Sequence, residues 1–157
     1  MANKGYIDVF QKSDLKRVQR IMLEGTDADI GKPYKFYHGV NNPKMDKLLV
    51  AINESDTPHG KTIGKMHLVE LDMAAAVKGE VKVTNKSVAT GTGKFISFRQ
   101  YYSPDGSLIA NSAAGSMLLI DAKTLKVIDN EPMANLEENH DAMFTPDGKY
   151  VIATSRT

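Results

Sequence analysis

Residues 102–111 read Tyr-Ser-Pro-Asp-Gly-Ser-Leu-Ile-Ala-Asn, and residues 144–153 repeat the pattern as Phe-Thr-Pro-Asp-Gly-Lys-Tyr-Val-Ile-Ala. The two prolines, Pro104 and Pro146, lie 42 residues apart. Proline sets the first turn position, aspartate bonds the local backbone, and glycine takes the left-handed conformation that lets the chain turn back. The pattern therefore predicts one β-hairpin that occurs twice.

A weaker copy of this hairpin lies at residues 36–51, around Pro43, which precedes Pro104 by 61 residues. Here Lys44-Met45-Asp46 replaces the Asp-Gly step, so we predict a different turn. Loops at 54–61 and 85–94 carry proline or glycine and account for the longer interval.

A second type of hairpin falls between these copies. Residues 115–128 read as strand, polar turn and strand, and residues 5–18 open the chain in the same way. Residues 66–83 form the middle copy, whose alanine-rich link at 74–78 favours one helical turn. Gln11, Asp72 and Asp121 fall at matching places in the three copies.

Two alternating hairpins in about 40 to 50 residues describe a four-stranded antiparallel blade, and such blades stack radially into a β-propeller. With the strands of a blade lettered A to D from the centre outwards, the all-β chain 1–157 is a single propeller segment. It comprises a C–D hairpin at 5–23, blades at 34–84 and 95–130, and an A–B hairpin at 139–155.

These pieces add up to about three blades, whereas propellers typically have four to eight. We therefore expect that the chain is a fragment of a longer propeller. Two alternatives are that two copies join into a six-bladed ring, or that another polypeptide supplies the remaining blades.

The phrases at 102–111 and 118–128 resemble the YVTN-type propeller repeat, whose group includes the propeller domains of cytochrome-type nitrite reductases and related nitrogen-cycle enzymes. The resemblance covers nearly the whole chain. It implies a periplasmic binding scaffold, part of or subunit of an extracytoplasmic redox enzyme complex. The matching residues are turn and core positions, so whether the chain is an enzyme stays open. The alternatives are a non-catalytic protein–protein interaction propeller and a lactonase-like hydrolase, which would need acidic residues at the channel mouth.

Composition excludes several classes of function. Lys and Arg total 20 against 19 Asp and Glu, a net charge of +1, which predicts no nucleic-acid binding. The absence of Cys excludes covalently attached haem and iron–sulfur clusters, and the absence of Trp excludes the Trp-Asp repeat signature. No apolar run reaches the roughly 18 residues of a membrane span, and the Met1-Ala2 start shows no signal-peptide core.

Of the four histidines, His38 and His140 occupy near-equivalent repeat positions, five and six residues before Pro43 and Pro146. Each lies at the entrance to an innermost strand. In the enzymes that the chain resembles, this entrance borders the central channel where haem or metals bind. The resemblance thus implies that His38 and His140 bind a cofactor, either haem or copper, supplied with partner chains.

Further candidates surround these two histidines. His59, in the loop at 56–60, is a third possible metal ligand, and Arg99, Tyr101 and Asp141 are expected on the channel face. The copper cluster of nitrous oxide reductase needs more histidines than the chain has. His67 lies between two apolar residues on a predicted strand, so we expect its side chain to be exposed or to lie at a sheet edge.

Overall fold

The computed structural model describes residues 6–23, 34–57, 61–90, 95–133 and 138–155. Within them, the regular structure is twelve β-strands and one short helix, α1 (Met73–Val77). No helix in these ranges is long and apolar enough to cross a membrane. The strands are β1 (Tyr6–Phe10), β2 (Arg17–Met22), β3 (Tyr34–Asn41), β4 (Lys47–Ser55), β5 (Thr62–Asp72), β6 (Val83–Thr90), β7 (Arg99–Tyr102), β8 (Leu108–Ser112), β9 (Ser116–Asp121), β10 (Val127–Pro132), β11 (Asn139–Phe144) and β12 (Val151–Ser155).

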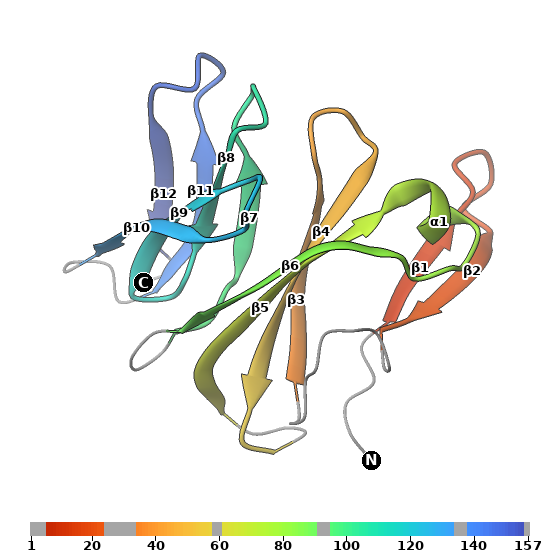
Figure 1. The fold of residues 1–157 in the computed structure, drawn as a ribbon, viewed down its shortest axis with the longest axis horizontal. Coiled ribbons are helices and arrows are strands. Elements are labelled where there is room, and N and C mark those ends of the chain that lie inside the picture. The colour runs from red at the N-terminus through yellow and green to blue at the C-terminus, as the bar shows by residue number, and fades with distance from the viewer. Residues whose placement is uncertain (1–5, 24–33, 58–60, 91–94, 134–137, 156–157) are drawn as a thin grey trace.

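The strands form four antiparallel sheets in strict chain order. Two sheets have four strands each, β3 to β6 and β7 to β10, and two are hairpins, β1–β2 and β11–β12. Figure 1 shows these sheets following one another across the molecule from the N-terminal to the C-terminal end. The predicted fold class, all-β with four-stranded antiparallel blades, is confirmed.

The three proline-marked turns share one geometry. Gly106 and Gly148 have φ of +74° and +70°, the left-handed region that favours glycine. Met45 takes the same place in the first copy with φ of +59°. The prediction of a different turn there was wrong. The Asn42 side-chain oxygen accepts hydrogen bonds from the N–H groups of Asp46 and Lys47, and these contacts support the same loop.

The second type of hairpin is also consistent between copies. The N–H groups of Gln11 and Asp121 donate to carbonyls five residues on, and in both turns a leucine has a φ of +55°. In the middle copy α1 enlarges the turn, and Asp72 caps it by accepting a hydrogen bond of 2.9 Å from the Ala75 N–H. This contact and the nearby Lys82 ammonium lower the pKa of Asp72. The helical turn predicted for the alanine-rich link is confirmed.

Strand β4 shows why the blades stack. Leu49 and Ala51 face one buried cluster shared with Ile109 of the next blade, whereas Val50 and Ile52 face a second cluster on the opposite side of the sheet. A strand covered on both faces is apolar at successive positions rather than at alternate ones. Burying each of these larger side chains contributes about 2 kcal/mol of stability, so the packing between sheets fixes the spacing of the strands nearest the centre.

Candidate functional site

Three strands hold most of the residues that the sequence singled out. Strands β3, β7 and β11 are the first strands of their sheets, and β7 contacts both β3 and β11. The structure places five of the six predicted site residues on or within these strands, and the sixth, His59, lies outside the described residues. We call the resulting group the inner-strand cluster, which consists of Tyr37, His38, Phe98, Arg99, Tyr101, His140 and Asp141.

His38 is held from the neighbouring blade. Its Nδ1 accepts a hydrogen bond of 3.2 Å from the Gln100 backbone N–H, and its ring lies 5.5 Å from the Tyr101 ring. Burial, followed by the charge of Arg99, lowers the pKa of His38. The ring is therefore neutral near pH 7. Because Nδ1 accepts a hydrogen bond, the proton of the neutral ring is on Nε2.

Asp141 lies between three polar side chains of the cluster. Its oxygens are 3.9 Å from Arg99 Nε, 3.5 Å from the Tyr101 hydroxyl and 3.3 Å from His140 Nδ1. Burial and the negative charge of Asp141 raise the pKa of Tyr101, so this phenol stays protonated. The carboxylate thereby links residues from two adjacent inner strands.

His140 has the opposite arrangement to His38. A carboxylate accepts hydrogen bonds, so in the neutral imidazole the contact with Asp141 places the ring proton on Nδ1. Nε2 then carries a lone pair, and it has no partner among the described residues. The Phe98 ring is stacked on the imidazole at 5.2 Å with 29° between the planes. A carboxylate on one nitrogen and a free lone pair on the other is the usual setting of a histidine that ligates a metal.

The cluster thus combines a hydrogen-bond donor, a potential ligand and aromatic rings. His38 offers an N–H group, His140 offers a nitrogen lone pair, and Arg99 adds a positive charge beside them. In the part of the chain that the structure describes, no three His, Cys, Asp or Glu side chains converge as a metal site. The described residues therefore offer a metal isolated nitrogen ligands rather than a converging set of side chains.

Sequence reasoning missed the aromatic part of the cluster. Tyr37 packs edge-on against Phe98, with ring centroids 5.7 Å apart, and Phe98 carries the stack on to His140. Tyr37 and Phe98 each directly precede a predicted site residue, and this position in the sequence could have identified them. That the three rings meet depends on how the blades approach one another.

His67 is neither exposed nor on an edge strand, and that prediction was wrong. Its Nε2 lies 2.7 Å from Glu54 Oε1, and each of the two residues keeps 7% exposure. The alternation rule failed because β5 is covered on both faces, so Met66 and Leu68 are buried as well. The pair ties β5 to β4 and lies outside the inner-strand cluster.

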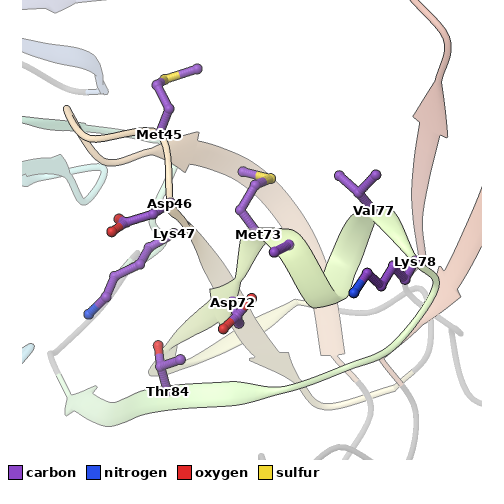
Figure 2. Close-up of a pocket in the computed structure, with 9 residues that line it drawn as sticks. Met45, Asp46, Lys47, Asp72, Met73, Val77, Lys78 and Thr84 are labelled. Carbon is purple, nitrogen blue, oxygen red and sulfur yellow. The ribbon is translucent and has the colours of Figure 1, made fainter.

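A pocket of about 640 Å³ lies at one end of the sheet β3 to β6. Figure 2 shows it between the turn that carries Met45, the helix α1 with Met73 and Val77, and Thr84 on β6. None of its lining residues belongs to the inner-strand cluster. Lys47 and Lys78 are the basic residues of its lining, which also includes apolar side chains.

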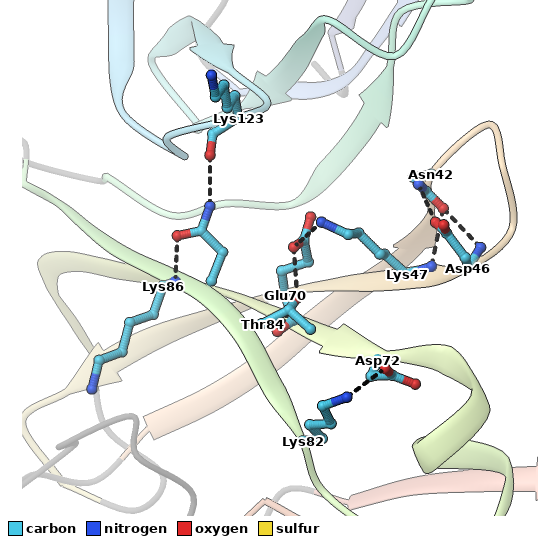
Figure 3. A network of polar contacts seen from close by, with 10 residues as sticks. Asn42, Asp46, Lys47, Glu70, Asp72, Lys82, Thr84, Lys86 and Lys123 are labelled. Carbon is cyan, nitrogen blue, oxygen red and sulfur yellow. Dashed lines mark hydrogen bonds and ion pairs between the residues drawn. The ribbon is translucent and has the colours of Figure 1, made fainter.

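The polar network drawn in Figure 3 shares Asp46, Lys47, Asp72 and Thr84 with the lining of this pocket. The buried Glu70 carboxylate accepts a hydrogen bond of 2.8 Å from Lys47 Nζ and one of 2.6 Å from the Thr84 hydroxyl. Burial and the charge of Glu70 raise the pKa of Tyr102, whose buried hydroxyl has no hydrogen-bond partner in the described part of the chain. The Asn85 amide donates to the Lys123 carbonyl at 2.8 Å and so joins the two four-stranded sheets.

Comparisons with known structures bear on the fold. The propeller of Dos1 aligns with a TM-score of 0.64 at 16% identity, covering 97% of this chain and 34% of that one. The chain is built of β-propeller blades. It spans about a third of the length of the Dos1 propeller chain.

A second solved structure, the dihydro-haem d1 dehydrogenase NirN in complex with DHE, aligns with a TM-score of 0.48 at 15% identity, covering 99% of this chain and 38% of that one. No family model matches the sequence, and no curated protein matches it. The alignment with the Dos1 propeller, at 16% identity, shows the fold of this chain and leaves its chemistry to its own residues.

Proposed function

We propose that this chain is a binding scaffold of an extracytoplasmic redox protein, built of YVTN-type repeats, whose inner-strand cluster holds a haem-type cofactor. The observation that carries the proposal is the His140 ring, with Nδ1 fixed by Asp141 and Nε2 available. The repeat type and the location outside the cytoplasm rest on the sequence resemblance.

The residues of the cluster fit such a cofactor. Haem iron commonly takes one histidine nitrogen as an axial ligand, and His140 Nε2 would be that ligand. Phe98, stacked on the ring, would fix its plane, and the Asp141 carboxylate would raise its basicity. Arg99 would supply a guanidinium group for the carboxylates of such a cofactor. When bound, haem would supply one-electron redox chemistry.

Copper fits the described residues less well than haem. Protein copper sites use several imidazole or sulfur ligands, whereas no three suitable side chains converge in the described ranges. His38 Nδ1 is occupied by the Gln100 N–H, and its Nε2 carries the proton. A cofactor that needs one protein nitrogen is therefore the better match.

Titration with haemin tests this proposal. We expect a haem absorption band to develop at one equivalent, and His140→Ala to weaken binding roughly tenfold or more, because it removes the iron ligand. Tyr150→Ala is the control, since Tyr150 is an aromatic residue with 69% exposure directly before β12. A wild-type chain that does not bind haemin, or a His140→Ala variant of unchanged affinity, would contradict the proposal.

We also propose that another stretch of polypeptide, from a second copy or a different chain, pairs with β12. In both four-stranded sheets the second strand pairs on both sides, β4 with β3 and β5, and β8 with β7 and β9. Among the described residues β12 pairs with β11 alone, and Ile152 on it is exposed. An edge strand with exposed apolar side chains is a template for a further strand.

The mass in solution tests this pairing. For the 17.2 kDa chain, sedimentation equilibrium is expected to give a multiple of the monomer mass. Ile152→Pro, which places a proline on the edge strand, is expected to reduce this association. A folded monomer at high protein concentration would refute pairing with a second copy, and failure of added partner chains to associate would refute the alternative.

A further inference from the structure

Gln100 is the residue on which the chemistry of His38 depends. It lies between Arg99 and Tyr101 on β7, yet its side chain is fully buried and points away from the cluster, towards the preceding blade. Its backbone N–H donates to His38 Nδ1 at 3.2 Å. Its side-chain Nε2 donates to the His38 carbonyl at 3.4 Å and to the Leu49 carbonyl at 3.3 Å.

These three contacts span two blades. His38 and Leu49 belong to β3 and β4, whereas Gln100 belongs to β7. The side-chain contacts fix the distance between β7 and β3 at the height of the His38 ring. That distance in turn brings the Gln100 N–H within hydrogen-bond reach of Nδ1.

The orientation of the Gln100 amide is also determined. Its Oε1 accepts a hydrogen bond of 3.3 Å from Asn111 Nδ2, which also donates to the Ser97 hydroxyl at 2.8 Å. Gln100, Asn111 and Ser97 are fully buried. A flipped amide would point its oxygen at two carbonyls, so Nε2 must face His38 and Leu49.

We propose that Gln100 is a positioning residue that fixes His38 as an N–H donor, through Nε2, to an oxygen atom of the bound ligand. The donor role towards a ligand rests on the proposed function, whereas the fixed tautomer does not. In this assignment the two histidines have different roles, because His140 offers a lone pair and His38 offers a proton. The ligand class is accordingly one that bears a metal and an acceptor oxygen, such as a carboxylate.

Nuclear magnetic resonance of the protein without haemin tests the tautomer. In proton–nitrogen correlation spectra of the imidazole rings near pH 8, above the ordinary histidine pKa of about 6.5, His38 is expected to show an unprotonated Nδ1 and a protonated Nε2. Gln100→Met, unbranched and of similar size, is expected to shift both nitrogens towards the averaged values of a mixture of tautomers. Unchanged signals from His67, whose pair lies elsewhere, would show that the fold is intact.

Either of two results would overturn the assignment. One is a wild-type His38 that carries its proton on Nδ1, a measurement that needs no variant to fold. The other is a folded Gln100→Met protein whose His38 signals are unchanged.

Haemin titration separates this inference from the proposed function. Gln100→Met is expected to weaken haemin binding about tenfold, the effect of losing one hydrogen bond to a charged group, without moving the absorption band set by His140. If the wild-type chain fails to bind haemin but His38 shows the expected tautomer, the proposed cofactor is refuted and the positioning role of Gln100 stands. Haemin binding by a wild-type chain whose His38 carries its proton on Nδ1 would support the cofactor and refute the positioning role of Gln100.

Discussion

Asn53→Ala is expected to lower the free energy of unfolding by about 4 kcal/mol. Asn53, on β4, holds Ser97 through two hydrogen bonds, accepting from its N–H at 3.0 Å and donating to its carbonyl at 3.2 Å. Both residues are fully buried. Truncation would leave a buried N–H and a buried carbonyl unpaired, each at a cost of about 1 to 3 kcal/mol.

Urea unfolding followed by circular dichroism measures this loss. Asn130→Ala, which truncates an exposed asparagine on β10, is the matched control and is expected to change stability by less than about 0.5 kcal/mol. A loss below about 1 kcal/mol for Asn53→Ala would show that the clamp between the blades does not carry the stability assigned to it. Ser97 leads into β7, so the same clamp bears on the geometry of the inner-strand cluster.

Glu54→Leu is expected to destabilise the protein by about 3 kcal/mol, because it removes one partner of a buried pair and leaves His67 without a hydrogen-bond acceptor. Adding His67→Leu is expected to restore part of that loss, since an apolar pair of similar size no longer requires a hydrogen bond. The four unfolding free energies form a double-mutant cycle.

The coupling energy is the informative quantity of this cycle. We expect it to exceed about 1 kcal/mol, as for residues in direct contact. Asn130→Ala and Asn130→Ala with His67→Leu provide the comparison, because Asn130 is exposed on β10, in the other four-stranded sheet. Additive losses for Glu54 and His67 would contradict the contact between their side chains.

The hairpins could be predicted because their turns are encoded locally. Pro-Asp-Gly at 104–106 and at 146–148 specifies a left-handed residue, and the structure has one at each glycine. At 43–46 the same turn forms around Met45 without a glycine. A hydrogen bond to the side-chain amide of Asn42 supports the turn in place of the Asp-Gly step. Local sequence thus determines the turn, but more than one sequence is compatible with it.

The site could be predicted only in part. The positions of His38 and His140 shortly before the repeat prolines predicted that both lie on the first strands of their hairpins, and they lie on β3 and β11. The protonation of their rings depends on Gln100 and Asp141, and the former contact joins residues 62 positions apart in the chain. The burial of His67 likewise depends on a second sheet covering β5. Contacts between blades are tertiary, and the repeat period of the sequence does not predict them.

Resonance Raman spectroscopy of the ferrous haem complex tests the central claim most directly, because it observes the bond between iron and histidine. We expect an iron–histidine stretching band that shifts when the protein is labelled with nitrogen-15 histidine, disappears in His140→Ala and persists in His38→Ala. A band that persists in His140→Ala, or that is lost in His38→Ala alone, would contradict the assignment of His140 Nε2 as the ligand of the inner-strand cluster.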